Sequence, residues 1–378
     1  MFKGSAIINC MHITKAEIYK IYLPLKEPFR VSFTSMTNRE IILIKLFDKN
    51  GLIGIGESAN FDFPFYEPDF NDGTIHLLKT YLVPAILNKK INTIEELEAI
   101  YKLMRGNNFS KTVIESAFWH LKSQQTGKPL RKLWGGTKTK IAAAISIGLG
   151  VDLKDSISRV LRYLKTYSPE RAKVKIKPGI DLKLIAAIRK DYPDLPLFVD
   201  ANSAYRLKDI KVFKELDKMN LLMIEQPLTY NDIVDHSILQ KQIKTPICLD
   251  ESIGNYHIAE QAIKIGACKI INIKPQRVGG YWQAKLISEL AAQNNIPVWC
   301  GGMIESGWGQ LLNCHISTLS NFKYANDICL TKWYFADDIL QKEIPEKNGT
   351  IDVAKTDSLF KIDEAKLNKY TVFKITVA

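Results

Sequence analysis

The chain has 378 residues, of which 46% are hydrophobic and 24% are charged, close to the averages of globular proteins. This balance excludes an intrinsically disordered chain, and no apolar run reaches the roughly 18 residues that a membrane-spanning helix needs. The formal net charge is +12. The lysines are nevertheless scattered, and no nucleic-acid-reading motif occurs, so we expect an anionic small molecule, rather than nucleic acid or a membrane, as the partner.

The first ten residues contain one short apolar patch, Ala6-Ile7-Ile8, which is too short for the core of a signal peptide. We therefore expect a cytoplasmic protein with a ragged N-terminal tail, and either Met1 or Met11 as the natural start. The six cysteines form no C-x-x-C pair and lie in apolar runs. They are predicted to be reduced, buried side chains.

The region from Ile13 to about Lys128 mixes predicted strands and helices without a regular order. The segments Ala16–Leu23 and Glu40–Asp48 have the composition of strands, and the second ends in a turn. The segments Thr93–Met104 and Ser110–Gln125 predict helices, each opened by a capping residue.

From about Thr139 onward, short apolar runs alternate with amphipathic helical segments, which predicts βαβ units and a parallel sheet. The predicted strands are 142–147, 172–176, 197–200, 223–226, 247–250, 270–274 and 297–300. Seven such units over roughly 200 residues fit a β/α barrel better than an open sheet. No glycine-rich dinucleotide fingerprint follows any of these strands, which also argues against an open nucleotide-binding sheet.

Five consecutive predicted strands carry a charged residue at or next to the carboxyl end: Lys175, Asp200, Glu225, Asp250 and Lys274. One β/α unit separates each of these residues from the next, at spacings of 25, 25, 25 and 24 residues. The carboxyl ends of barrel strands form the face where such enzymes keep their active sites. We therefore expect these five side chains to surround one mouth.

Each of these residues also has a simpler explanation, because a strand-terminal Asp often caps the next helix and an isolated Lys is often solvated. Three converging carboxylates, however, would repel one another unless a hard cation lay between them, and carboxylate oxygens suit Mg²⁺. A nearby dication would depress the pKa of one flanking lysine enough for it to act as a base. The other lysine would stay charged and stabilise developing negative charge.

The residues around these positions resemble the muconate-cycloisomerase-like branch of the enolase superfamily. The resemblance rests on the segments 173–175, 199–202, 224–227, 249–252 and 272–275, and on 56–58, 64–66, 117–119 and 133–136 outside the strand ends. It implies a modified TIM-type (β/α)7β barrel over residues 131–339. It also implies an α+β capping domain over residues 1–130 that the segment 340–378 completes.

Within this branch, the segments 274–280 and 301–307 are most similar to the group of o-succinylbenzoate synthases and N-succinylamino acid racemases. Gln276 departs from the glycine that is usual in this group. Arg277 matches an arginine associated with racemase-competent members, and it permits racemisation without establishing it. The capping segment Pro28–Phe33 is expected to form a lid over the barrel mouth, because it contains an aromatic pair.

The resemblance implies that Asp200, Glu225 and Asp250 bind Mg²⁺, with Mn²⁺ as a substitute, and that Lys175 and Lys274 handle the proton next to a carboxylate through an enediolate. The predicted substrate-binding residues are Lys173, Asn202, Ser146, Arg277, Gly302, Met303, Ile304 and Glu305.

The activity that the resemblance implies first is that of an o-succinylbenzoate synthase, a lyase of menaquinone biosynthesis, in a homo-oligomer. The alternatives are an N-succinylamino acid racemase or a dual enzyme, and then a dipeptide epimerase or muconate cycloisomerase. An alternative of another class is a non-catalytic binding protein on the same barrel.

Overall fold

The structure, a computed structural model, describes residues 10–30, 35–167, 169 and 171–378. Two long antiparallel strands, β1 (Met11–Arg30) and β2 (Ser35–Asp48), form the centre of its first sheet. The predicted strands 16–23 and 40–48 lie within them. The order of this sheet is β15-β1-β2-β3, with β3 at Ile53–Ser58 and β15 at Thr371–Val377, and a short strand, β4 (Lys90–Ile91), also pairs with β1.

The long helix α4 (Asn108–Thr126) packs against β3 and buries the stripe of Val113, Ala117 and Leu121. It begins at Asn108 instead of the predicted Ser110, and it ends at Gly127 in the left-handed conformation, with φ 65°. The remaining helices of this region are α1 (Asn71–Leu77), the π-helix η1 (Leu78–Leu82), α2 (Val83–Ile86), α3 (Ile94–Ile100) and α5 (Leu130–Leu133).

Two glycines of β3 allow α4 to approach the sheet closely. A Cβ atom at Gly56 would lie 2.0 Å from the Val113 carbonyl oxygen and 2.7 Å from Ser116 Oγ. We expect Gly56→Ala to lower the free energy of unfolding by about 1–3 kcal/mol, because the helix must shift. Gly254→Ala, where nothing lies within 4 Å of the added Cβ, is the matched control. Denaturant unfolding of both variants checks this expectation, and equal midpoints would contradict it.

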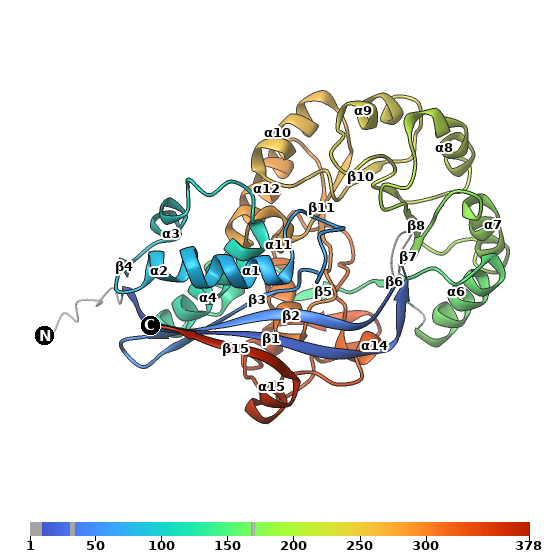
Figure 1. Ribbon diagram of the computed structural model, residues 1–378. Coiled ribbons are helices and arrows are strands. Elements are labelled where there is room, and N and C mark those ends of the chain that lie inside the picture. Colours follow the sequence, from blue (N-terminus) through green and yellow to red (C-terminus); the bar gives the residue numbers. More distant parts are fainter. Residues whose placement is uncertain (1–9, 31–34, 168, 170) are drawn as a thin grey trace, which may run out of the picture.

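The second half of the chain forms a curled parallel sheet with helices on its outer side (Figure 1). The strand order is β12-β11-β10-β9-β8-β7-β6, so each strand lies beside its neighbour in sequence. The strands are β6 (Ile145–Ile147), β7 (Ala172–Lys175), β8 (Leu197–Asp200), β9 (Ile224–Glu225), β10 (Ile247–Leu249), β11 (Ile270–Ile273) and β12 (Val298–Cys300). The outer helices are α6 (Leu153–Tyr167), α7 (Asp181–Asp191), the 3-10 turn η2 (Leu207–Asp209), α8 (Ile210–Leu216), α9 (Val234–Gln240), α10 (Tyr256–Ile265) and α12 (Tyr281–Gln293), with the short α11 (Pro275–Val278) after β11.

The segment 322–327 closes this sheet into a barrel between β12 and the chain that leads into β6. The Asp327 N–H donates to the Cys300 carbonyl at 2.8 Å, and the Ala144 N–H donates to the Asn326 carbonyl at 2.7 Å. The predicted barrel is thus confirmed, and Asp327 lies in the closing segment beside β12.

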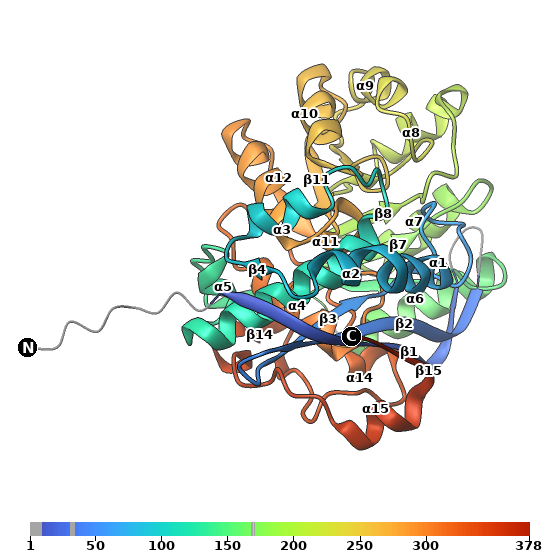
Figure 2. The same cartoon turned by 60° about the vertical axis from the view of Figure 1, so that its left-hand side comes forward.

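The C-terminal part of the chain returns to the first sheet. Its β15 pairs antiparallel with β1, from Ala16 opposite Val377 onward, and Figure 2 shows the C-terminus beside β1 and β2. The helices of the C-terminal region are α13 (Gly307–Ile316), α14 (Thr331–Tyr334), η3 (Val353–Thr356) and α15 (Glu364–Tyr370). Its strands β13 (Glu346–Lys347) and β14 (Thr350–Asp352) form a small sheet with β5 (Lys140–Ala142), which precedes the barrel strands in the sequence.

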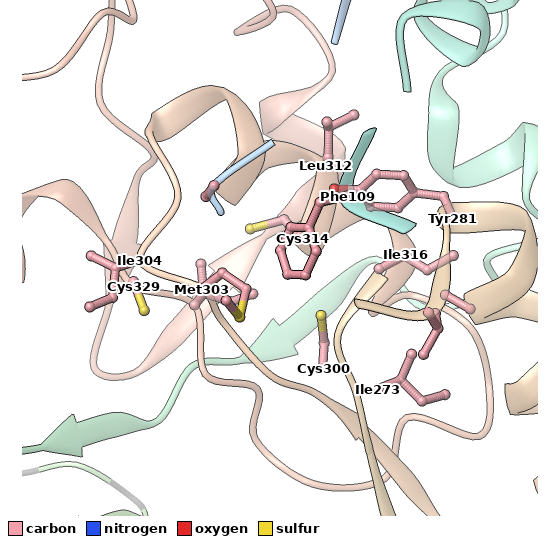
Figure 3. Close-up of a cluster of buried hydrophobic side chains, with 14 of the residues drawn as sticks. Phe109, Ile273, Tyr281, Cys300, Met303, Ile304, Leu312, Cys314, Ile316 and Cys329 are labelled. Carbon is pink, nitrogen blue, oxygen red and sulfur yellow. The ribbon is translucent and has the colours of Figure 1, made fainter. Parts of the chain in front are cut away.

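One hydrophobic core joins the two regions. Phe109 of α4 lies among barrel side chains that include Ile273, Tyr281 and Cys300 (Figure 3). This shared core fixes α4 and the loops near it against the barrel mouth. Across the described residues, no helix is both long enough and apolar enough to span a bilayer.

Candidate active site

A cavity lies between loops of the first region and the carboxyl ends of the barrel strands. Phe29, Met36, Phe61, Phe65 and Tyr66 of the N-terminal region form its apolar wall. The predicted site residues that line it are Ser146, Lys173, Lys175, Asn202, Lys274, Gly302, Met303 and Ile304, together with Asp327 and Cys329.

The predicted lid, Pro28–Phe33, is described only in part. Residues 31–33 lie outside the described residues. Phe29, in the described part, lines the cavity, which is the position that a covering segment needs.

Two lysines line the cavity from strands on opposite sides of the acidic strand ends. Lys175 ends β7, and its Nζ donates to Asp200 Oδ2 at 2.5 Å. Lys274 follows β11 directly, and its Nζ donates to Asp250 Oδ2 at 2.9 Å and to the Tyr66 hydroxyl at 2.8 Å. Burial alone would lower the pKa of Lys274, but Asp250 and Tyr66 raise it well above its usual value.

The three predicted metal ligands lie on three adjacent strands and are fully buried. Asp200 and Glu225 end β8 and β9 and are paired in register, and Asp250 lies one residue beyond β10. Lys173 Nζ lies 3.5 Å from both Asp200 Oδ2 and Glu225 Oε2. Two of the carboxylates therefore converge on one ammonium group.

The third carboxylate, Asp250, is held by Lys274 and by the guanidinium of Arg277. In the part of the chain that the structure describes, no three acidic, His or Cys side chains gather closely enough to hold a metal ion. Each carboxylate instead faces its nearest cation, because a buried negative charge needs an opposite charge beside it.

Burial and charge move the pKa values of these carboxyl groups in different directions. Burial and the neighbouring Asp200 raise the pKa of Glu225 to about 8. Burial would also raise the pKa of Asp200, but Lys175 and Lys173 lower it below its ordinary value. Lys274 and Arg277 lower the pKa of Asp250 in the same way.

The donor atoms at these strand ends fit a hard divalent cation such as Mg²⁺ or Mn²⁺. Asn272 Nδ2 donates to Glu225 Oε1 at 2.7 Å, and Glu225 Oε2 is buried without a hydrogen-bond partner among the described residues. Asp200 Oδ1 accepts from the Asn202 N–H at 2.9 Å. Two carboxylates are thus oriented by amide groups, and one oxygen of each lies 3.5 Å from Lys173 Nζ.

Several loops at the mouth adopt backbone conformations that side chains rarely take. Asn202, Gln226 and Ile304 have positive φ angles of 41°, 35° and 57°. For a β-branched residue such as Ile304 this conformation is costly, and such residues cluster at functional sites.

Three buried polar residues support the site, and the sequence had suggested no role for them. Asp327 Oδ2 lies 2.7 Å from Lys173 Nζ. Gln226 Oε1 accepts from the backbone N–H groups of Asp250 at 3.0 Å and Ser252 at 3.2 Å, which orients the loop after β10. Gln276, the departure from the group's usual glycine, accepts from the Ala59 N–H at 2.6 Å and ties an N-terminal loop to α11.

The cavity lining does not include two of the predicted substrate-binding residues, Arg277 and Glu305. Arg277 is buried behind Asp250, where its Nε donates to the Ile253 carbonyl at 3.0 Å. Glu305 is buried and accepts from Asn313 Nδ2 at 2.9 Å. Both side chains therefore lie behind the wall of the cavity.

Comparison with known families agrees with this architecture. The family model described as "Enolase C-terminal domain-like" matches residues 155–357, and that of the "Mandelate racemase / muconate lactonizing enzyme, N-terminal domain" matches residues 13–135. The chain belongs to the enolase superfamily. Enzymes of the enolase superfamily generally depend on a divalent metal and act on small anionic substrates.

Relatives within the enolase superfamily are similar over nearly the whole chain. An o-succinylbenzoate synthase of Geobacillus kaustophilus is 41% identical, over 93% of this chain and 94% of the relative. An N-succinylamino acid racemase of Thermus thermophilus is 37% identical, over 91% and 92%. A crystal structure of an enolase superfamily member from Listeria innocua superposes with a TM-score of 0.92 at 36% identity, over 97% of this chain and 99% of that chain.

Proposed function

We propose that this chain is an o-succinylbenzoate synthase, a lyase that removes water from a cyclohexadiene carboxylate and so forms the aromatic succinylbenzoate. The observation that carries the proposal is the placement of Lys175 and Lys274 on opposite flanks of three buried carboxylates, in one cavity with apolar walls. The 41% identity to a synthase supports the choice of reaction.

The proposed ligands of Mg²⁺, with Mn²⁺ as a substitute, are Asp200, Glu225 and Asp250. When bound, the ion supplies positive charge that holds the substrate carboxylate and stabilises the negative charge that forms there as the adjacent proton leaves. The side-chain amide of Asn272 and the backbone N–H of Asn202 orient Glu225 and Asp200 for this task.

Lys175 is the proposed base. Its amine takes the proton next to the carboxylate, and the resulting ammonium assists the departure of the hydroxyl group as water, so that one C–H and one C–O bond break and the ring becomes aromatic. Lys274 is held by Asp250 and Tyr66 on the other flank. There it remains an ammonium group facing the ring, where a cation is attracted to π density.

The remaining predicted substrate-binding residues are proposed to surround the substrate. Ser146, Lys173 and Asn202 supply polar groups to the cavity, and Gly302, Met303 and Ile304 shape its far wall. Arg277 and Glu305 are proposed to support binding from behind this wall.

The opposed lysines also suit racemisation, because each could remove or return a proton on its own face of the α-carbon. The relative that is 37% identical and named N-succinylamino acid racemase supports this second candidate, alone or as a dual activity. Dipeptide epimerisation and muconate cycloisomerisation are further reactions that suit the same constellation.

The deciding experiment is a dehydration assay run beside an exchange assay in D₂O with N-succinyl amino acids, both with Mg²⁺. Dehydration alone identifies a synthase, exchange of the α-proton alone identifies a racemase, and both identify a dual enzyme. Turnover of neither substrate class, with exchange on a dipeptide instead, would overturn both candidates.

We further propose that the enzyme works in the cytoplasm as a homo-oligomer on a small anionic substrate. We also propose a division of the chain into a capping domain of residues 1–130 and 340–378 and a barrel domain of residues 131–339. The pairing of β15 with β1 supports this division.

A further inference from the structure

A second, much smaller hollow lies beside the catalytic cavity. Phe29 and Ser146 line both spaces, so the two adjoin at these residues. The second hollow, which we call the side pocket, is lined by Leu25, Glu27, Phe29, Ser146, Gly148, Arg159, Tyr163, Trp333 and Tyr334.

The side pocket contains one basic side chain among its described lining residues, that of Arg159 on α6. This side chain is only 11% exposed, and its Nε atom is buried without a hydrogen-bond partner in the described part of the chain. A buried guanidinium N–H without an acceptor is costly, and it is a ready donor to an anion.

The charged groups around Arg159 have a net positive charge. Among the described residues, its acidic partner is Glu27, at 3.1 Å from Arg159 Nη2. Glu27 is also held by both terminal nitrogens of Arg162, at 3.1 and 3.3 Å, which lowers the pKa of Glu27. One carboxylate thus serves two guanidinium groups, and a further negative charge would balance the cluster.

Contacts among Ser146, Phe29 and Tyr334 form the boundary between the two spaces. Tyr334 exchanges hydrogen bonds with the backbone of Ser146, accepting from its N–H at 3.2 Å and donating to its carbonyl at 2.9 Å. The ring of Phe29 lies edge-on to that of Tyr334, with centroids 6.0 Å apart. Ser146 is in turn the register partner of Lys173 in the neighbouring strand β7, so the side pocket begins one strand away from Lys173 and Lys175.

We propose that Arg159 binds a second carboxylate of the substrate, one remote from the reacting carbon. The inference rests on the proposed function and deepens it, because the substrates of both candidate reactions are dianions in which a succinyl group carries the distal charge. With the first carboxylate at the strand ends, the succinyl chain passes between Phe29 and Ser146, and its carboxylate accepts from Arg159 Nε. Arg159 is thus a residue that determines specificity for dicarboxylates.

Pairs of compounds that differ only in the distal carboxylate test this inference. In Arg159→Met, we expect kcat/KM for an N-succinyl amino acid to fall about tenfold to a hundredfold, as for the loss of a charged hydrogen bond. For the N-acetyl derivative of the same amino acid, which lacks that carboxylate, we expect less than about a threefold change. Arg159→Lys, which keeps the charge, should recover part of the loss.

The matched control is Arg162→Met, which alters the same helix and the other partner of Glu27. The Arg162 side chain is 55% exposed and does not line the side pocket. This variant should therefore leave kcat/KM unchanged for both compounds. An equal loss for both compounds in Arg159→Met would overturn the inference, as would a wild-type enzyme without preference for the N-succinyl compound.

A binding measurement separates this inference from the proposed reaction. Titration calorimetry of the Mg²⁺-loaded enzyme with o-succinylbenzoate and with benzoate reads the same contact without turnover. We expect Arg159→Met to lower the affinity for o-succinylbenzoate and to leave the affinity for benzoate unchanged, even if neither proposed reaction occurs. Unchanged affinity for o-succinylbenzoate would overturn the role of Arg159 whatever the catalytic assays give.

Discussion

Replacing Lys175 by alanine is expected to lower kcat for dehydration by about 10²–10⁴-fold, the usual contribution of a positioned general base. The Nζ atom that is lost lies 2.5 Å from Asp200 Oδ2 and borders the cavity. Asp200 keeps a second cation, Lys173, at 3.5 Å, so the buried carboxylate is not left without a partner. Mg²⁺ affinity, measured by calorimetry, should therefore stay close to that of the wild type.

A matched control for this variant is Lys183→Ala, because Lys183 is an exposed residue on α7, the helix that follows Lys175. Its turnover should equal that of the wild type. Turnover by Lys175→Ala within threefold of the wild type, in a protein that unfolds at the wild-type temperature, would remove Lys175 from the role of base.

Replacing Asp250 by asparagine is expected to raise the Mg²⁺ concentration needed for half-maximal activity. Because Asp250 is a proposed direct ligand, the increase should exceed the 10- to 100-fold loss of affinity that is typical when a residue behind a metal ligand is changed. The same change leaves Lys274 and Arg277 facing a neutral amide in a fully buried position. Loss of one member of a buried ion pair costs about 3–5 kcal/mol, so we also expect a lower unfolding temperature. A titration of activity against Mg²⁺ and a thermal scan measure the two effects.

Glu225→Gln separates the loss of metal binding from the loss of stability, because among the described residues Glu225 has no ion-pair partner closer than Lys173 at 3.5 Å. We expect it to weaken Mg²⁺ activation with a smaller change in unfolding temperature than Asp250→Asn. Asp191→Asn, at an exposed position at the end of α7, is the neutral control. Wild-type Mg²⁺ titrations for both Asp250→Asn and Glu225→Gln would count against the proposed ligands.

The barrel was predictable because its strands repeat at nearly constant spacing and five of the seven carry a charged residue at or just beyond the carboxyl end. Asp200 and Glu225 end their strands, while Asp250 and Lys274 follow theirs by one residue. This small difference did not affect the prediction, because both places face the same end of a barrel. The helix boundaries were less accurate, and α4 begins two residues before the predicted cap.

The parts of the site that depend on packing between distant segments were not predictable from spacing. Asp327 lies in the irregular segment that closes the barrel, so no strand pattern marked it. Gln226 and Gln276 act through bonds to backbone groups that are distant in the sequence or in another element. Arg159 lies on an outer helix, where an arginine ordinarily indicates a solvated face, and only the fold brings it beside Ser146.

The pairing of β15 with β1 has a consequence for how the protein is made. Residues 16 and 377 are partners in the sheet, and translation delivers β1 long before β15. The growing chain on the ribosome therefore presents an open β1 edge, rich in isoleucine and leucine, while the whole barrel is synthesised. The β1 edge gains its partner only when β15 emerges, after the whole barrel has been synthesised.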